Sequence, residues 1–357
     1  MSESLDLKIT KAMERIEELY YQTEGKCYLS FSGGKDSTVI LALIKMCEEI
    51  YTLPKNAIPA VFSNTGIELG ATVDFVKWVK ENWYQNVEII RPEKPFQWIM
   101  ENHGKPMKSK LKSDFISRYQ VSKRVDTGSF AHLLGNSRDG KNCHRTRLAD
   151  KDLHMIHDNL NIKVSDKCCH ILKKKPFEKY KKENDIKGYL LGERLAEGGA
   201  RDFSTLKRLS LGGKICTKTK GKYLVKLPIV DWTNEDIETF IEKYNVPLSK
   251  AYTEQGYERT GCFMCPFSLQ IEQNLTKLHE YEPNRYKASM VWLEDVFIAQ
   301  NVKLPFDEAY EKKRKEKWTQ PGGLFDMRLE MLERYRPEKL EKYKHLSSKE
   351  YWTDKNF

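Results

Sequence analysis

A short segment with two glycines, a lysine and two serines lies between two apolar runs near the start of the chain. The segment is residues 32–37, with the sequence SGGKDS; the apolar run 27–31 precedes it and the run 38–44 follows it. This order predicts a strand, a tight turn and a helix, which is the arrangement that a phosphate site requires. Gly33 and Gly34 allow the backbone to turn tightly and bring its N–H groups close to an anion.

The other side chains of this segment are also suited to phosphate. Lys35 adds a mobile positive charge, and the hydroxyls of Ser32 and Ser37 are hydrogen-bond donors for phosphate oxygens. Ser37 and Thr38 are expected to open the helix, whose N-terminal end favours phosphate. The Walker A spacing, with four residues between a glycine and the Gly-Lys pair, is absent. The sequence therefore predicts a phosphate-binding loop of another kind.

Two pairs of cysteines stand out among the eight in the chain: Cys168 with Cys169, and Cys262 with Cys265. A Cys-x-x-Cys turn allows two thiolates to hold one metal or cluster, although redox dithiols use the same spacing. The tandem pair is poorly suited to structural zinc because adjacent side chains diverge, yet it can serve two irons of one cluster. The remaining cysteines show no such pattern and are expected to be packing residues or incidental thiols: Cys27, Cys47, Cys143 and Cys216.

The elements that must position these residues alternate between strand and helix. After an amphipathic helix over residues 5–24, the sequence predicts strands at 27–32, 57–62 and 87–92, with helices at 37–50 and 72–83 between them. Such alternation predicts an α/β fold with a doubly wound, mostly parallel sheet, which binds ligands at the carboxyl ends of its strands. The 32–37 segment and the turn Asn64, Thr65, Gly66 are both expected at that edge.

The rest of the chain is less regular. Residues 95–165 are expected to form a mobile loop or an inserted helical segment, and strands are expected again at 188–192 and 224–229. A helix with a capping signal follows Thr233, and the sequence is helix-like from about residue 270. We predict a nucleotide-binding domain over residues 1–265, interrupted by 95–165, and a helical extension over 266–357. We also expect the C-terminal part of the fold, beside the sheet, to be helical and to bear cysteines.

Composition limits the class of protein. The 357 residues carry a formal net charge of +10, which favours a polyanionic ligand: nucleic acid, or a nucleotide with several phosphates. The basic clusters near the C-terminus interleave with glutamate, which favours solvated helix faces there. No run approaches the roughly 20 apolar residues that span a bilayer, and residues 1–6 lack the features of a secretory signal. A cytoplasmic protein without membrane contact is expected, and its eight cysteines are expected to include metal or redox residues and not to form a disulfide framework.

Several motifs together resemble one known family. SGGKDS resembles the pyrophosphate loop of the ATP-pyrophosphatase superfamily, and the tandem cysteines followed by Cys-x-x-Cys resemble the [4Fe–4S] ligand pattern of assimilatory adenylylsulfate reductases. The surrounding residues are similar to the phosphoadenylylsulfate (PAPS) reductase family, particularly its phage and mobile-element members. The resemblance runs from about residue 26 to 270, and its further motifs are Lys167 with Lys173 and Pro176, Gly192-Glu193-Arg194 with Glu197 and Arg201, Pro228-Ile229 with Asp231-Trp232-Thr233, and 256–262 (GYERTGC).

This resemblance implies an adenine nucleotide, ATP or an adenylylsulfate, and a set of site residues. Lys35, Asp36, Arg194 and Arg201 would be catalytic, by handling phosphates and metal and by neutralising charge near the α-phosphate or sulfate. The nucleotide-binding residues would be Ser30, Ser32, Gly33, Gly34, Lys35, Asp36, Ser37, Asn64, Thr65, Gly66, Gly192 and Glu193. A [4Fe–4S] cluster would be held by Cys168, Cys169, Cys262 and Cys265.

One departure from the family decides which reaction is expected. Reductases of this family attack sulfur with a cysteine in a C-terminal tail, but no cysteine follows Cys265 in this sequence, and Gly198 replaces a serine of the family. ATP-pyrophosphatase or sulfur-transfer chemistry with Mg²⁺ is therefore favoured, similar to tRNA-thiolating enzymes and the ATP pyrophosphatase of DNA phosphorothioation. The alternatives are a reductase that releases sulfite with thioredoxin, for which Cys143 or Cys216 would have to act, and a non-catalytic nucleotide or cluster sensor.

The expected partners follow from these alternatives. They are the adenine nucleotide and either a sulfur donor or a thioredoxin-like protein, with nucleic acid left open as an acceptor. A homo-oligomer is expected.

Overall fold

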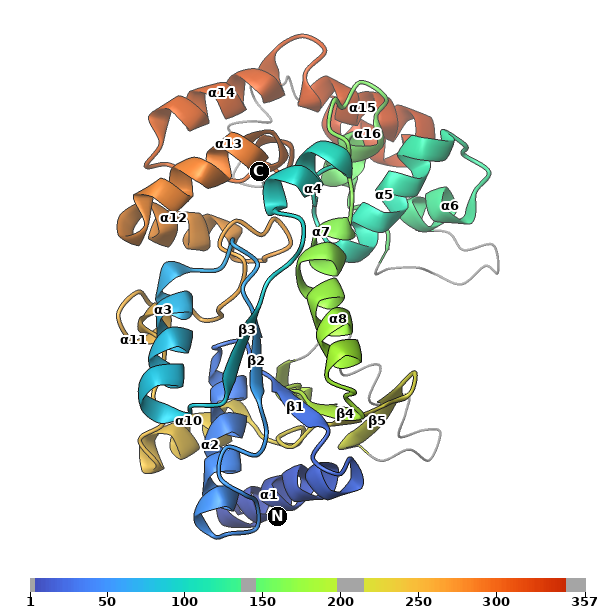
Figure 1. The fold of residues 1–357 in the computed structure, drawn as a ribbon. Coiled ribbons are helices and arrows are strands. Elements are labelled where there is room, and N and C mark those ends of the chain that lie inside the picture. Colours follow the sequence, from blue (N-terminus) through green and yellow to red (C-terminus); the bar gives the residue numbers. More distant parts are fainter. Residues whose placement is uncertain (1–3, 136–145, 198–214, 345–357) are drawn as a thin grey trace. The chain divides into compact units, whose positions relative to one another are not determined.

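The computed structural model describes residues 4–135, 146–197 and 215–344, and the chain divides into two units that each combine two segments. The first unit comprises Met1–Glu93 and Leu172–Cys262, and the second comprises Lys94–Ile171 and Phe263–Phe357. The segment predicted as an insertion thus groups with the C-terminal helices (Figure 1). Gly198 and the predicted site residue Arg201 lie outside the described residues.

The first unit is built on a six-stranded sheet with the strand order β3-β2-β1-β4-β6-β5. All neighbours are parallel except β5, which runs antiparallel to β6 at the edge. The predicted fold class, a mostly parallel α/β sheet with a helical C-terminal part, is therefore confirmed; β5 was not predicted. The strands are β1 (Cys27–Ser30), β2 (Ala60–Ser63), β3 (Val87–Ile90), β4 (Gly188–Leu190), β5 (Thr217–Lys220) and β6 (Tyr223–Lys226).

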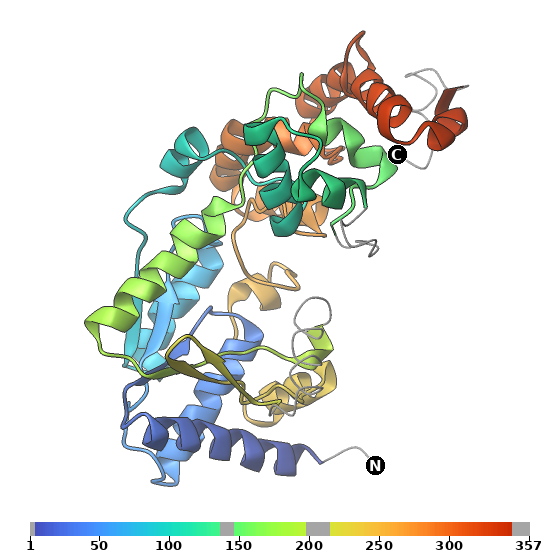
Figure 2. The ribbon, with the colours of Figure 1, turned by 90° about the vertical axis from the view of Figure 1, so that its right-hand side faces the viewer.

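Helices cover both faces of this sheet (Figure 1 and Figure 2). Side chains alternate along a strand, so Leu29 of β1 packs with the helices of one face and Tyr28 with the other. The first face carries α1 (Leu5–Gln22), α2 (Lys35–Glu49), α3 (Gly70–Trp78) and α10 (Asn234–Lys243). The second face carries α8 (Lys175–Glu183), through the aromatic cluster of Tyr28, Tyr180 and Tyr189. The central strands β1, β2 and β4 are thus buried on both faces, as is typical of a parallel sheet.

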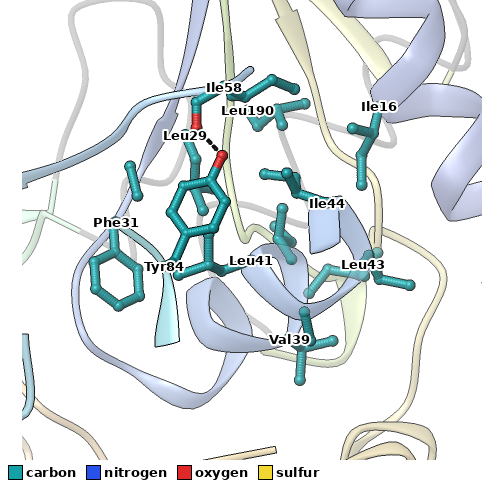
Figure 3. Close-up of a cluster of buried hydrophobic side chains, with 14 of the residues drawn as sticks. Ile16, Leu29, Phe31, Val39, Leu41, Leu43, Ile44, Ile58, Tyr84 and Leu190 are labelled. Carbon is teal, nitrogen blue, oxygen red and sulfur yellow. Dashed lines mark hydrogen bonds between the residues drawn. The ribbon is translucent and has the colours of Figure 1, made fainter. Parts of the chain in front are cut away.

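The core of the first face fixes α2 on the sheet (Figure 3). Ile40, Leu41 and Ile44 of α2 are fully buried, next to Leu29 of β1. The dashed line in this view joins the Tyr84 hydroxyl to the Ile58 carbonyl oxygen, to which it donates at 2.8 Å. Because α2 cannot shift without opening this core, its N-terminus is held at the carboxyl end of β1.

The second unit, as described, is helical. The segment before residue 171 supplies α4 (Phe96–Asn102), α5 (Lys110–Ser122), α6 (Gly128–Leu134), the 3₁₀ helix η2 (Asp150–Ile156) and α7 (Lys167–Cys169). The later segment supplies α12 (Ile271–Tyr281), α13 (Pro283–Ala299), α14 (Glu308–Thr319), α15 (Leu324–Tyr335) and α16 (Pro337–Lys344). α15 packs on η2, and the Arg336 guanidinium after it bonds to the Asp150 carboxylate at 2.5 Å and the Leu148 carbonyl at 2.9 Å. None of the described helices is both long and apolar enough to cross a membrane.

Candidate phosphate site in the first unit

The 32–37 segment forms the expected turn between β1 and α2, but the helix begins earlier than predicted. α2 starts at Lys35, with Gly34 as its N-cap residue in an extended conformation, and not at Ser37. The hydroxyls of Ser37 and Thr38 both donate to the Gly34 carbonyl oxygen, at 3.0 and 2.9 Å, so they lie inside the first turn. Lys35 and Asp36 are therefore first-turn residues at the positive end of the helix.

Serine hydroxyls hold the turn in shape. The Ser32 and Ser37 hydroxyl oxygens lie 3.0 Å apart, and the Gly34 N–H donates to the Ser32 hydroxyl at 3.2 Å. The Ser32 N–H donates to the Ser37 hydroxyl at 3.2 Å. The hydroxyls of Ser32 and Ser37 were predicted to donate to phosphate. In the structure they hydrogen-bond within the loop and stabilise its conformation.

Glycines are required here by close approach as well as by conformation. Gly33 has φ +69°, and a Cβ on it would lie 3.0 Å from the Thr72 side chain of α3. A Cβ on Gly192, just after β4, would lie 3.1 Å from Cβ of Asp36. These contacts allow β1, α3 and the segment after β4 to converge on the N-terminus of α2.

A cavity of about 560 Å³ opens at this point, at the carboxyl ends of β1 and β4. Eight of its lining residues were predicted from the sequence: Ser30, Ser32, Gly34, Lys35, Asp36, Ser37, Gly192 and Arg194. Eight more were not predicted as nucleotide residues: Ala196, Asn234, Ile237, Glu238, Tyr252, Glu258, Arg259 and Thr260. The sequence did contain signals for them, because Asn234 follows the helix cap Thr233 and residues 258–260 belong to the GYERTGC motif.

Arg194 and Asp36 form an ion pair within the cavity wall. The Arg194 Nε donates to Oδ1 of Asp36 at 2.7 Å, and its Nη1 donates to Oδ1 of Asn234 at 3.0 Å and the Trp232 carbonyl at 3.3 Å. The Arg194 side chain is 8% exposed and that of Asp36 is 24% exposed. Arg194 thus connects the first turn of α2 with the start of α10 and holds Asp36 in position. The sequence did not reveal this contact.

Another wall of the cavity is formed by Tyr252 of α11 (Lys250–Thr253) and by residues 258–260 after it. The Lys35 ammonium lies 5.2 Å from the centre of the Tyr252 ring, a cation–π distance. The Tyr252 hydroxyl accepts a hydrogen bond from the Thr260 N–H at 3.2 Å. A Cβ on Gly34 would lie 3.1 Å from the Thr260 hydroxyl, so this wall touches the loop directly.

Five other predicted residues are not among those that line the cavity. Gly33 packs against α3, and Glu193 forms an ion pair with Lys218. Asn64, Thr65 and Gly66 follow β2 at the expected edge, where the Gly66 N–H donates to the Asn64 side chain at 3.0 Å and the Thr65 hydroxyl donates to the Glu68 carboxylate at 2.9 Å. The predicted roles of all these residues stay predictions.

The predicted cluster ligands are divided between the two units. Cys168 and Cys169, with Sγ atoms 4.0 Å apart, and Cys265 belong to the second unit, whereas Cys262 ends the first. In the first unit, Cys262 pairs in a β-bridge with Glu68, whose buried carboxylate lies 3.3 Å from the Lys173 ammonium. Within the described residues of each unit, no three His, Cys, Asp or Glu side chains are arranged to hold a metal ion. The thiol set suits iron chemically, but the described part of neither unit contains a preformed site, and we derive no reaction step through a cluster.

Two other cysteines are packing residues, as expected. Burial raises the pKa of the Cys27 thiol to about 11 and that of Cys47 to about 12. Cys27 of β1 and Cys47 of α2 both lie in the core, where burial favours the neutral thiol and keeps a substrate away from the sulfur. Cys143 lies outside the described residues.

Several known proteins are similar to this chain in sequence or in structure. Two uncharacterized proteins of Methanocaldococcus jannaschii are 24% and 25% identical over 266 and 265 residues, and the chain spans only 47% and 40% of their lengths. The phosphoadenosine 5'-phosphosulfate reductase of Vibrio campbellii is 19% identical over 258 residues, 72% of this chain and 73% of that protein. The PAPS reductase of Candida auris, solved as a phosphate complex, aligns with 73% of this chain and 97% of its own at 15% identity, with a TM-score of 0.41.

The match to a family model is more extensive. The model of the phosphoadenosine phosphosulfate reductase domain matches residues 26–126 and 136–268, which is well over half of the chain. The matched residues include the β1 strand, the 32–37 loop, Arg194 and the 252–260 wall, so they contain every residue that lines the cavity. The chain therefore belongs to the phosphoadenosine phosphosulfate reductase domain family.

Proposed function

We infer that this chain is an adenine-nucleotide enzyme that binds the phosphates of its substrate at residues 32–37 and carries out ATP-pyrophosphatase or sulfur-transfer chemistry. The observation that carries this proposal is the cavity at the N-terminus of α2, where the loop, Lys35 and the first helical turn meet. Its volume of about 560 Å³ is within the usual range for small-molecule sites.

The charge arrangement supports phosphate as the group bound there. The first N–H groups of a helix have no partner inside the helix, so those of α2 are donors for an anion at the loop. Lys35 and Arg259 add positive charge to the same cavity. In this reaction an acceptor atom would attack the α-phosphorus and become adenylylated, while the bond from the α-phosphorus to the bridging oxygen breaks. Pyrophosphate would leave from ATP, or sulfate from an adenylylsulfate, and donors that are fixed before the reaction stabilise the charge that develops on the leaving group.

Mg²⁺ fits this site without a preformed cage, because it is usually held by one or two carboxylates together with the substrate phosphates. Asp36 is the carboxylate in the first turn of α2, and Arg194 fixes its position through Oδ1. When bound, Mg²⁺ would offset phosphate charge. The protein's own contribution is to hold Asp36 and Lys35 beside the phosphate loop.

The side chains of the cavity disfavour sulfur reduction within this site. Reduction of an adenylylsulfate needs a thiolate that attacks sulfur. Among the described residues that line the cavity, none is a cysteine. Pyrophosphate-forming or sulfur-transfer chemistry, which the phosphate loop and its charges can support, is therefore the preferred reaction.

A PAPS or adenylylsulfate reductase is the second candidate, and the Vibrio relatives support it. Two proteins named phosphoadenosine 5'-phosphosulfate reductase each align with 72% of this chain. In that case a thioredoxin-like protein would be the electron donor, and a thiol outside the described cavity residues would have to reach the substrate. Cys143 and Cys216 are the candidates to test.

Paired assays on anaerobically purified protein distinguish the two reactions. We expect pyrophosphate release from Mg-ATP, measured with and without added sulfide and nucleic acid, and loss of that activity in Lys35→Ala. Lys80→Ala, which removes an exposed lysine of the same unit, is the matched control and should retain activity. Thioredoxin-dependent sulfite release from either adenylylsulfate, abolished by Cys143→Ser or by Cys216→Ser, would instead establish the reductase. Nucleotide binding with neither reaction would favour a sensor.

A further inference from the structure

A surface rich in lysine lies on the second face of the sheet in the first unit, and two segments form it. One is α8, whose exposed lysines Lys175, Lys179 and Lys182 follow one another at spacings of four and three residues, so they share one side of the helix. The other is the hairpin of β5 and β6, where Lys220 and Lys222 are exposed at and beside the turn. We call these five residues the lysine face.

Lys181 joins the two segments. Its side chain is buried, and its ammonium lies 4.2 Å from the centre of the Tyr223 ring of β6 and 5.3 Å from that of the Tyr189 ring of β4. Lys220 lies opposite Tyr223 in the register of the hairpin, so both side chains are on the α8 side of the sheet. Burial, and after it the Lys220 charge, lowers the pKa of Lys181. The end of α8 and the hairpin, which are separate in the sequence, thus form one surface (Figure 1).

Few carboxylates balance the charge of this surface. Residues 172–191 and 215–226 together contain 11 lysines and three acidic residues. Within the lysine face, only Lys179 has a carboxylate of the described residues at ion-pair distance, Glu93 at 3.2 Å, and both partners are exposed. An exposed pair of this kind contributes little. The other four ammonium groups of the lysine face repel one another and would be stabilised by a bound polyanion.

The composition of the lysine face distinguishes between classes of polyanion. Protein interfaces are enriched in arginine and aromatic side chains and depleted in lysine, which disfavours an acidic protein. A membrane surface is bound through apolar side chains beside the basic ones, but no large apolar side chain of the described residues 172–191 and 215–226 is exposed. Lysine ammonium groups are compact, strongly hydrated point charges, and in this number they suit the phosphates of a nucleic-acid backbone.

We propose that the lysine face binds the phosphate backbone of a nucleic acid. The three lysines of α8 span about 10 Å along the helix, and a duplex carries one negative charge per roughly 1.7 Å of its axis, so several phosphates lie within their reach. Contacts to phosphate carry no sequence information, and binding is therefore independent of base sequence. The lysine face contains none of the residues that line the phosphate-loop cavity, so this interaction does not rest on the proposed reaction.

Fluorescence anisotropy on the full chain tests this proposal with a labelled DNA duplex of about 20 base pairs and the RNA duplex of the same sequence. We expect saturable binding at about 50 mM salt, with the logarithm of affinity falling linearly with the logarithm of salt concentration. Lys182→Ala combined with Lys220→Ala should reduce the magnitude of this slope by about 2. The matched control is Lys77→Ala combined with Lys80→Ala, which removes the same charge from α3 and from the π-helix η1 (Val79–Trp83) on the first face and should leave the slope unchanged.

Three outcomes would overturn the proposal. The first is no saturable binding of either duplex, as expected if the lysines of β5 only protect an edge strand from pairing with another chain. The second is an equal change of slope in the control variant, which would show that net charge alone attracts the duplex. The third is tighter binding of polyglutamate or of phosphatidylserine vesicles than of either duplex, which would assign the lysine face to an acidic protein or a membrane.

Two features keep this test separate from others. The substituted lysines are exposed, and circular dichroism that matches the unaltered protein shows that each variant is folded, so a reduced slope reports lost phosphate contacts. The binding measurement contains no ATP and no adenylylsulfate, so its failure would leave the proposed reaction untouched, and a failed pyrophosphate assay would leave the lysine face untouched.

Discussion

The ion pair between Arg194 and Asp36 gives the sharpest test of how the phosphate loop is held. Arg194 makes three hydrogen bonds, to the Asp36 carboxylate and to two acceptors at the start of α10, and its side chain is only 8% exposed. Asp36→Ala leaves this guanidinium buried with its neutral acceptors alone, which we expect to destabilise folding by about 2–4 kcal/mol. Arg194→Ala should cost a similar amount, because it removes all three bonds.

A double-mutant cycle isolates the pair itself. Since Asp36 is 24% exposed, we expect a coupling free energy of about 1.5–3 kcal/mol, the range for hydrogen bonds to charged groups, and not more. Urea unfolding followed by circular dichroism gives the four free energies, provided that the m-values of the variants agree. The exposed pair Lys26 and Asp185 of the same unit is the control and should show a much smaller coupling.

Two outcomes would refute this reasoning. A coupling below about 0.5 kcal/mol would show that the pair does not hold the turn. A variant Arg194→Ala with unchanged stability but greatly weakened nucleotide binding would show that the guanidinium serves the ligand directly, as the sequence alone suggested.

Four further expectations are open to simple measurements. Lys35→Ala should weaken binding of both ATP and adenylylsulfate by about 1.5–3 kcal/mol in calorimetry, and unchanged affinity for both ligands would exclude the phosphate assignment. Gly192→Ala should destabilise by about 1–3 kcal/mol in urea unfolding, because its Cβ meets Asp36 at 3.1 Å, whereas Gly261→Ala, with no atom within 4 Å, should be neutral. His154 has a folded pKa of about 3, below its unfolded value, so stability should fall as pH drops from about 6.5 towards 3; the loss between pH 7 and 5 should be about 2 kcal/mol and should disappear in His154→Gln. Anaerobically prepared protein should contain about four irons that are lost in Cys262→Ala, and stoichiometric zinc or metal-free protein would reject the cluster.

Neighbouring residues determined the phosphate loop, and for that reason the sequence revealed it. Strand, turn and helix are set by apolar runs and by glycines within about twenty residues, so their order was clear from 27–44 alone. The exact start of α2 was not clear, because Gly34 can cap a helix without a side chain. The Ser37 and Thr38 hydroxyls, which resemble caps in the sequence, lie inside the first turn of α2. β5 was missed because its TKTK sequence lacks the apolar alternation of a half-buried strand and is stabilised by pairing with β6 at an edge.

The composition of the site depended instead on contacts between distant segments. Arg194 meets Asp36 across 158 residues, and Tyr252 and Thr260 reach the loop from beyond residue 250. Local propensity says nothing about such pairs, because their geometry is fixed by the strand order that brings β4 beside β1.

The sequence by itself determined the class of fold, the family motifs and the phosphate loop, since each rests on contiguous residues whose conformation is decided locally. Only the tertiary structure decided that residues 94–171 pack with the C-terminal helices and bury Asp152, His154 and Arg328. Burial removes water from these side chains, and it is this removal that keeps His154 neutral. No pattern along the chain carries that information, because desolvation is a property of the packed molecule.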